Sequence, residues 1–476
     1  MTESNAVPSA SMTSPPAESQ PGPEARADPE AGAGPRAGAG TGQRLAWLDV
    51  LRGLAALCVV FNHFGFFVPP RANEAVYQWI NPGDYGVFVF FIISGYIVPA
   101  SLERNGSVRS FWVSRLFRLY PLYLLAVGLA VLLWAVHFGG DLRGEGADPE
   151  ASGFSQLLMM SNVLGGKNLP NVVWSLSYEM IFYLLLTALF LARIHRRSSS
   201  CALLFGVAAV ALGGLLPQAY FNGALSSPRF IAGVADLVVI TGLALVVVRR
   251  GLPRLTGAVL AAAVGLALLA FNGTWLHPWE ALSIMALMFT GTTLYRAERG
   301  QYPWRYAIAI AIAVLGMTVA AGLWHYRATG ASAESTWERS WFLTVTLAGL
   351  TFGLGLAFRH VAWPRALTWL GLISYSVYLL HPLLIEVYRH LSLTGRHYSL
   401  WPQLLVDAVF LVILIAMCSL TYLLVERPMQ HAGRQLARWL DATFGSDRAP
   451  GWTPAAAEPA LAAAPARSPA DLPAPP

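Results

Sequence analysis

Twelve apolar segments, each about as long as a membrane-crossing helix, dominate the chain between residues 44 and 430. Each is roughly 16 to 24 residues long, and a helix needs about 20 apolar residues to cross the hydrocarbon core of a bilayer. The segments are 46–68, 86–101, 119–138, 173–193, 200–219, 228–248, 256–272, 281–296, 304–324, 340–358, 366–387 and 402–425. Hydrophobic residues make up 55% of the sequence and charged residues only 12%, which is unlike an ordinary soluble domain. The sequence therefore predicts an all-α, polytopic integral membrane helix bundle.

Arginines alternate between the connections that join these segments. Every even-numbered connection carries an arginine cluster, whereas the odd ones are mixed or acidic, and the longest of these, 139–172, holds four carboxylates. Because cytoplasmic loops are enriched in Lys and Arg, this alternation places both termini in the cytoplasm. Segments 86–101 and 281–296 are short, so the expected number of transmembrane helices is 10 to 12. Since the arginines lie between apolar segments, we expect them to set topology and expect no nucleic-acid partner.

Two segments outside the apolar region have a different composition. Residues 1–43 are rich in Pro, Ala and Gly without an apolar run, which predicts a disordered tail and no secretory signal peptide. Residues 431–476 are expected to form a cytoplasmic Ala/Pro-rich tail, with the folded region ending near Phe444. One transmembrane domain, 44–430, lies between them. The cysteines have no metal-ligand spacing, so we expect no metal site.

The first apolar segment carries two polar side chains, Arg52 and His63. Ionisable residues inside membrane spans are costly and usually face a cavity or a partner. Eleven positions are close to three helical turns, so both side chains share one helix face about 16 Å apart. They are therefore placed to line a shaft across the membrane. The alternative is that Arg52 extends to lipid headgroups and His63 only satisfies a backbone carbonyl.

Two further segments carry ionisable residues at a comparable depth. In the segment 173–193, Glu179 is expected about two turns below the outer surface. In the segment 366–387, Tyr378 and His381 share a helix face, and Pro382 predicts a kink beside them. Under the predicted topology, His63, Glu179 and His381 all lie in the outer half of the membrane. The alternative is that these polar side chains only form contacts that hold the helices together.

On the cytoplasmic side, Arg115 and Arg118 lie one turn apart before the third apolar segment. Guanidinium groups suit phosphate because they donate several hydrogen bonds in a fixed geometry. The pair is therefore a candidate site for a nucleotide or an anionic headgroup. The alternative is a simple positive-inside anchor.

Several motifs together resemble the membrane-bound acyltransferase 3 family, which includes bacterial O-acyltransferases of cell-surface polysaccharides, Nod factors and macrolides. They are the spacing of Arg52 and His63 in "LDVLRGLAALCVVFNHFG", then "VFFIISGYIV", "RLFRLYPLY", "WSLSYEMIFY", "ISYSVYLLHPLL" and "ERP". The resemblance extends from about residue 44 to 430. It implies a multi-pass protein of the bacterial cytoplasmic membrane. The near absence of lysine, with Lys167 alone, is typical of a bacterial genome of high GC content.

The resemblance implies transfer of an acyl group from cytoplasmic acyl-CoA to a hydroxyl of a carbohydrate, glycolipid or macrolide. We favour acetyl-CoA as the donor. The family's essential arginine and histidine correspond to Arg52 and His63, and its acidic residue corresponds to Glu179. Our hypothesis makes His63 the general base, because a neutral histidine commonly activates a hydroxyl. Glu179 then orients His63 or stabilises the imidazolium that forms. Direct transfer is the simplest route, and an acyl-enzyme intermediate stays open.

The remaining site residues follow from the same hypothesis. Arg52, Arg115 and Arg118 are expected to hold the phosphates of CoA, and Ser94 and Tyr378 to line the shaft. His381, Asn62 and Trp174 are expected to contact the acceptor.

Two other function classes fit parts of the sequence. A transporter or flippase for a glycan, lipid or small molecule has a similar number of spans, although we find no internal repeat of the kind transporters often show. The second class is a membrane scaffold that catalyses no reaction, and it does not explain the buried histidine and glutamate.

Overall fold

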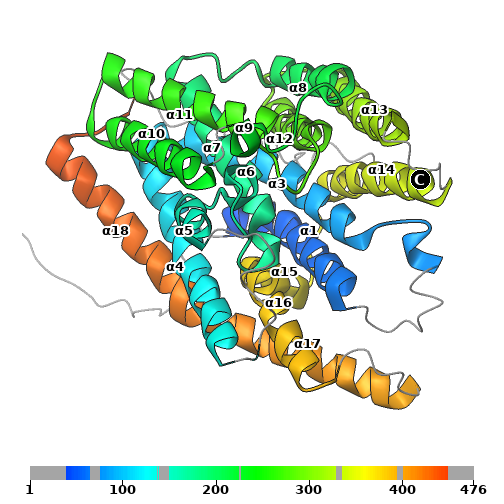
Figure 1. The fold of residues 1–476 in the computed structure, drawn as a ribbon. Helices are drawn as coiled ribbons and strands as arrows, with labels where there is room; N and C mark the ends of the chain where they lie inside the picture. The colour runs from blue at the N-terminus through cyan, green and yellow to red at the C-terminus, as the bar shows by residue number, and fades with distance from the viewer. Residues whose placement is uncertain are drawn as a thin grey trace, which may run out of the picture. The chain divides into compact units, whose positions relative to one another are not determined.

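Helices and their connecting turns account for the described part of the chain, which contains no strand. The computed structural model describes residues 39–64, 75–136, 138, 149–224, 227–328, 335–393 and 400–448. The larger helices are α1 (Ala39–Phe64), α3 (Pro82–Asn105), α4 (Val108–Ala135), α7 (Trp174–Leu191), α8 (Ser198–Leu212), α10 (Pro228–Val248), α11 (Leu252–Phe271), α12 (Pro278–Glu298), α13 (Trp304–Ala328), α14 (Ser335–Ala357), α16 (Ser374–His390), α17 (Leu400–Thr421) and α18 (Arg427–Phe444) (Figure 1). Short helices α5 (Pro149–Leu157), α6 (Ser161–Leu164), α9 (Tyr220–Ala224) and α15 (Arg365–Leu372) lie between them. The predicted all-α class is confirmed.

The expected tails fall largely outside the described residues. Residues 1–38 and 449–476 are not described, so the disordered N-terminal tail and most of the Ala/Pro-rich C-terminal tail stay predictions. Residues 431–448 are described, and α18 extends through them as far as Phe444. The helices from Gln43 onward belong to one compact unit, Gln43–Pro476.

Nine helical segments of the described ranges are long and apolar enough to cross a membrane, and the bent pair α15 and α16 makes up to ten. Each of the twelve apolar segments contains a helix within its described residues; residues 65–68 of the first segment are not described. Two of these helices do not meet the criteria for a span: α8 has only 15 residues, and α12 is not among the sufficiently apolar helices. The span count therefore lies at the lower end of the predicted 10 to 12. The orientation of the termini stays a prediction.

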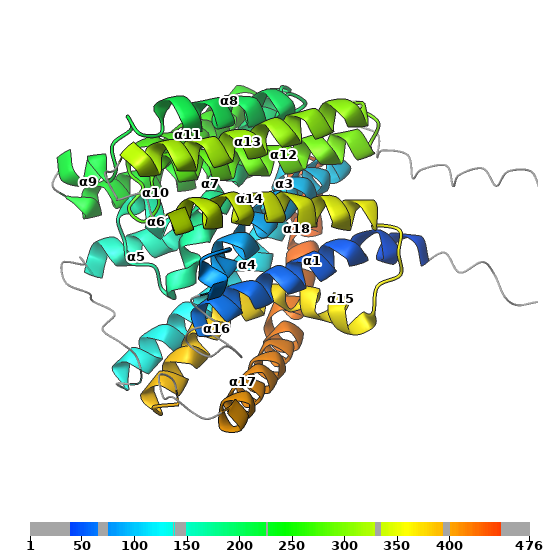
Figure 2. The same ribbon diagram turned by 90° about the vertical axis from the view of Figure 1, so that its right-hand side faces the viewer.

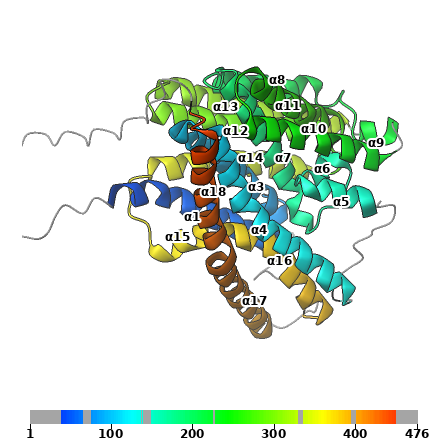
Figure 3. The same cartoon turned by 90° about the vertical axis from the view of Figure 1, so that its left-hand side faces the viewer.

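Helix α12 lies inside the bundle and packs against α3, α8 and α13. Figures 2 and 3 show α8, α12 and α13 on one side of the bundle and α17 on the opposite side. Glycines allow α3 and α12 to approach closely: a Cβ on Gly95 would lie 1.8 Å from the carbonyl oxygen of Met288, and one on Gly291 would lie 2.2 Å from that of Ile92. The two helices therefore cross backbone to backbone, and α3 is fixed as one wall of the site.

The turn between α3 and α4 places the arginines of α4. Gly106 ends α3 in the left-handed region at φ 63°, where glycine has no steric penalty. The next residue, Ser107, caps α4 by accepting a hydrogen bond from the amide of Ser110 at 3.0 Å. Arg115 and Arg118 follow within the first three turns of α4. Local sequence thus sets where the α4 arginines stand.

The sharp bend near this part of the site lies before α16. It measures 67° and separates α15 from α16 at Ile373, whereas α16 continues as one helix through Pro382 to His390. Proline cannot donate the backbone hydrogen bond to the carbonyl four residues earlier, which belongs to Tyr378. The kink expected at Pro382 stays a prediction.

Candidate functional site

Polar side chains from five helices surround one cavity in the described part of the bundle. It encloses about 760 Å³, including space open to solvent. Helices α1, α3, α4, α7 and α16 line it. Its polar lining residues are Arg52, Ser94, Arg115, Arg118, Ser175, Glu179, Tyr183, Ser374, Tyr375 and Tyr378. The cavity therefore unites six residues that the sequence analysis assigned to one site: Arg52, Ser94, Arg115, Arg118, Glu179 and Tyr378.

Three arginines give the cavity its positive charge. Arg115 is buried, with its guanidinium carbon 5.4 Å from the ring centre of Phe111 and 5.6 Å from that of Tyr183. Its Nε has no hydrogen-bond partner among the described residues. Arg52 interacts electrostatically with Arg118, a like charge. A cluster of like charges with an unused donor suits an anionic ligand.

Glu179 is the carboxylate that lines the cavity. Its Oε1 accepts hydrogen bonds from the hydroxyl of Ser94 at 3.3 Å and from the hydroxyl of Tyr183. It also interacts electrostatically with Arg52 and Arg115. None of the hydrogen bonds within the described residues joins Glu179 to His63. The expected orientation of His63 by Glu179 is therefore absent from this arrangement, and Glu179 instead balances the arginines.

His63 pairs with His381 instead. The Nδ1 atom of His63 lies 3.0 Å from Nε2 of His381 and 3.0 Å from the carbonyl oxygen of Val59. The Nδ1 atom of His381 lies 2.9 Å from the carbonyl oxygen of Val377, which can only accept. His381 is therefore protonated on Nδ1, and its Nε2 accepts from Nδ1–H of His63.

This hydrogen-bond pattern fixes which nitrogen of His63 is basic. Both neighbours of its Nδ1 accept, so a neutral His63 carries its proton there and leaves the lone pair on Nε2. His381 is fully buried, whereas His63 is exposed at the end of α1. The pair thus offers an accessible base held by a buried partner.

Tyr378 joins the histidine pair to the cavity. It lines the cavity, and its ring centre lies 6.3 Å from that of His381. Its hydroxyl bonds with Ser175 at 2.7 Å and donates to the carbonyl of Val172 at 2.7 Å. Helix α16 therefore carries both Tyr378, which lines the cavity, and His381, which belongs to the histidine pair, one helical turn apart.

Two residues expected to contact the acceptor have structural partners. The side-chain oxygen of Asn62 accepts from the hydroxyl of Tyr77 at 3.0 Å and from the amide of Gly83 at 3.1 Å, which ties the end of α1 to the start of α3. Trp174 is half-buried at the start of α7, and its ring meets that of Tyr178 edge to face at 6.1 Å. Their contact with an acceptor stays a prediction, as does that of His381.

Glu426 belongs to the surroundings of the site, although the sequence analysis gave it no role. A π-helical segment, Tyr422–Glu426, turns it inward, and it is only 3% exposed. It accepts from the hydroxyl of Ser376 and interacts electrostatically with Arg118 and Arg52. Its place in the "ERP" motif was the available signal. Segments of this kind often occur at functional sites.

A family profile described as acyltransferase domain matches residues 45–235 and 236–424. The chain belongs to the acyltransferase 3 family. The match covers most of the helical unit, including both histidines and every polar residue of the cavity. The resemblance drawn from the motifs is confirmed.

Three relatives illustrate the range of this acyltransferase family. Acyltransferase MdmB of Streptomyces mycarofaciens is 32% identical over 30% of this chain and 38% of its own length. Nodulation protein 10 of Rhizobium leguminosarum bv. viciae is 29% identical over 37% of this chain and 51% of its own. The putative peptidoglycan O-acetyltransferase YrhL of Bacillus subtilis is 30% identical over 29% of this chain and 22% of its own. The chain thus matches about half or less of each relative. No solved structure shows significant similarity.

Proposed function

We propose that the protein is an integral membrane O-acyltransferase. It moves an acyl group, which we take to be acetyl, from cytoplasmic acyl-CoA to a hydroxyl of a carbohydrate or glycoconjugate. The observation that carries the proposal is the His63–His381 pair beside an arginine-lined cavity, in a chain of the acyltransferase 3 family. The name of the relative YrhL, a putative peptidoglycan O-acetyltransferase, favours a polysaccharide hydroxyl as the acceptor.

The donor occupies the arginine end of the site in this proposal. Arg52, Arg115 and Arg118 hold phosphate groups of acyl-CoA through charge-assisted hydrogen bonds. Arg52 and His63 lie eleven residues apart on α1, about 16 Å along the helix axis. The thioester arm extends over that distance, past Ser94 and Tyr378, toward the histidine pair. Hydroxyl groups on these two residues support the thioester carbonyl.

His63 activates the acceptor. Its Nε2 takes the proton of the acceptor hydroxyl while the hydroxyl oxygen bonds to the thioester carbonyl carbon. The carbon–sulfur bond then breaks, and the CoA thiolate takes the proton back from the His63 imidazolium. His381 acts as a positioning residue: its Nε2 accepts from Nδ1–H of His63, fixes the tautomer and stabilises the imidazolium.

Glu179 acts on the donor side rather than on the base. Its carboxylate offsets the positive charge of Arg52 and Arg115 and keeps the hydroxyls of Ser94 and Tyr183 in place. The proposed location is the bacterial cytoplasmic membrane, with both termini in the cytoplasm. Donor and acceptor then reach the site from opposite faces.

The test is transfer of radiolabel from acetyl-CoA in membranes that contain wild type, His63→Gln or Arg52→Gln. Extracted glycans and lipids serve as acceptors. We expect an alkali-labile labelled ester with wild type alone, at equal amounts of protein in the membrane. Equal labelling by the variants overturns the proposed mechanism. Wild-type export of a glycan or lipid without ester formation indicates a flippase instead.

A further inference from the structure

Helix α18 carries a row of basic side chains that the proposed reaction does not use. Arg427, His431, Arg434 and Arg438 are spaced four, three and four residues apart, so they lie on one helix face. All four are exposed. Among the described residues, none of these arginines forms an ion pair with a carboxylate; the one nearby acid of α18, Asp441, pairs with Arg109 at 3.2 Å. We call these four residues the basic stripe.

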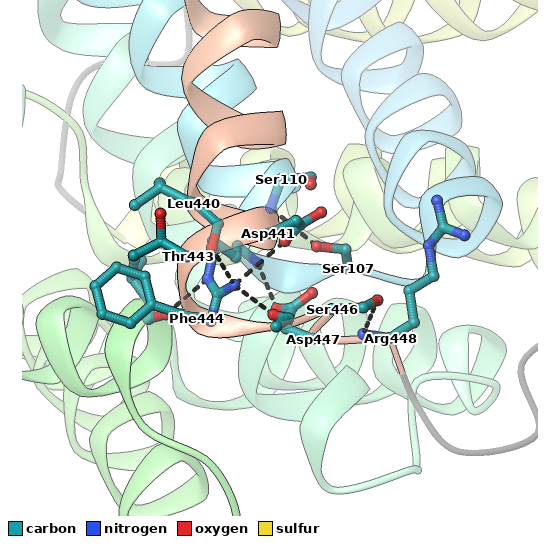
Figure 4. A network of polar contacts seen from close by, with 12 residues as sticks. Ser107, Ser110, Leu440, Asp441, Thr443, Phe444, Ser446, Asp447 and Arg448 are labelled. Carbon is teal, nitrogen blue, oxygen red and sulfur yellow. Dashed lines mark hydrogen bonds and ion pairs between the residues drawn. The ribbon is translucent and has the colours of Figure 1, made fainter.

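The opposite face of α18 is fixed to the bundle. Gly433 is buried against Phe117 of α4, where an added Cβ would lie 2.6 Å from the Phe117 side chain. At the C-terminal end, the Arg109 guanidinium donates to the carbonyls of Val247, Leu440 and Gly445. Figure 4 shows the polar contacts at this end, with Leu440 and Asp441 of α18 labelled. Arg250 donates to the carbonyl of Phe444 at 2.8 Å. Helix α18 therefore presents the basic stripe on a fixed support.

These partners also place α18 along one end of the bundle. Arg109 lies in the first turn of α4, Val247 in the last turn of α10, and Arg254, which bonds to Asp447 at 2.5 Å, in the first turn of α11. Figures 2 and 3 show α18 running transverse to α14 and α12. The C-terminal end of α18 therefore packs where α4 and α11 begin and α10 ends.

The sequence before α18 marks the level of the bilayer. Helix α17 continues through Tyr422–Glu426 into α18, so Trp401–Phe444 is one helix of 44 residues, about 66 Å long and longer than the hydrocarbon core is thick. The exposed apolar side chains of Leu420, Leu423 and Leu424 directly precede Arg427. Exposed Trp439, 58% exposed, lies beside the basic stripe, and tryptophan favours the membrane interface. The charged groups that the basic stripe can meet just beyond the hydrocarbon core are those of lipid headgroups.

We propose that the basic stripe of α18 binds the headgroups of anionic phospholipids. An amphipathic helix with arginines on its polar face and an aromatic residue beside them is typical of such binding. Bound lipids then contact the exposed face of α18, whereas Arg109 and Arg250 fix its C-terminal end to the bundle.

The experiment titrates phosphatidylglycerol into purified protein in a zwitterionic detergent and measures bound lipid by native mass spectrometry. The stripe variant is Arg434→Gln with Arg438→Gln, since glutamine keeps helix propensity. The control is Arg327→Gln with Arg389→Gln, the same charge change at exposed residues in the last turns of α13 and α16. Each arginine near an anionic surface contributes about fivefold in affinity, so we expect the stripe variant to bind roughly thirtyfold more weakly and the control to bind as wild type.

Two further measurements sharpen the outcome. Arg434→Lys with Arg438→Lys keeps the charge and should retain binding, whereas the thermal midpoint of the glutamine variant without lipid should match wild type, since the stripe faces away from the bundle. Undiminished binding by the glutamine variant overturns the proposal. Equal loss in the control, or equal binding of phosphatidylcholine by wild type, overturns it as well.

Discussion

The imidazoles of His63 and His381 lie within hydrogen-bond distance, 3.0 Å between Nδ1 and Nε2, although 318 positions separate them in the chain. One belongs to the end of the first long helix and the other to α16. Their relationship gives His63 a defined tautomer and a buried partner. It also makes the contributions of the two histidines separable by substitution.

Replacing His63 by glutamine should abolish most transfer. Loss of a general base typically costs about 10²- to 10⁴-fold in rate, so we expect kcat to fall by that factor. Because His63 is exposed, the variant should accumulate in the membrane as wild type does. Initial rates with saturating acetyl-CoA measure the effect. A rate within threefold, or about 0.65 kcal/mol, of wild type excludes His63 as the base.

Replacing His381 should distinguish positioning from bulk packing. In His381→Ala no acceptor remains for Nδ1–H of His63 except the Val59 carbonyl, so kcat should fall roughly 10- to 100-fold with little change in the KM for acyl-CoA. In His381→Gln the amide oxygen can accept that hydrogen bond, and most of the rate should return. Equal rates for the two variants contradict the positioning role.

Replacing Arg118 should weaken donor binding. Arg118 lines the cavity together with Arg52, and its removal takes away one of the proposed phosphate ligands. We expect Arg118→Gln to raise the KM for acyl-CoA about 10- to 100-fold. Arg118→Lys should have a smaller effect. An unchanged KM in the glutamine variant argues against a phosphate-binding role.

Replacing Gly95 by alanine should destabilise the bundle. The new Cβ would lie 1.8 Å from the Met288 carbonyl, so α3 and α12 must separate. Overpacking of this kind costs about 1–3 kcal/mol, which should lower the thermal midpoint. The matched control is Gly128→Ala on α4, where nothing lies within 4 Å of the added Cβ. Similar midpoints for the two variants would show that the crossing tolerates separation.

Replacing Arg109 should loosen the C-terminal end of α18. Arg109 is 1% exposed, and its guanidinium donates to three carbonyls and to Asp441. Removing one partner of a buried charged network costs about 3–5 kcal/mol, so Arg109→Ala should lower the thermal midpoint and expose residues after Phe444 to protease. The exposed neighbour variant Arg249→Ala is the control and should behave as wild type.

Hydropathy and periodicity predicted the helices of this protein well, because each helix is encoded locally. Each of the twelve apolar segments contains a helix within its described residues, and six of the predicted site residues line one cavity. Periodicity also placed Tyr378 and His381 correctly on a shared face of α16. Features that are determined within a single helix could therefore be predicted from the sequence.

The contacts between different helices could not be predicted from the sequence. The depth of His63, Glu179 and His381 in the membrane could be estimated, but depth does not determine which helix faces pack together. Glu179 accepts hydrogen bonds from Ser94 and Tyr183. The 67° bend between α15 and α16 was also missed, because the sequence around Ile373 holds no proline to mark it. Glu426 was missed because a π-helical segment changes which way its side chain points.

The burial of α12 bears on how the protein is made. Nearly every residue from Pro278 to Ala297 is buried, and the helix is not apolar enough to qualify as a span by itself. An insertion machinery that selects segments by hydropathy would have little reason to release such a helix into lipid early in synthesis. Its neighbours α3 and α8 precede it in the chain, and α13 follows it. Biogenesis should therefore retain α12 until α13 has emerged, so truncation before Trp304 should leave a chain that quality-control proteases remove.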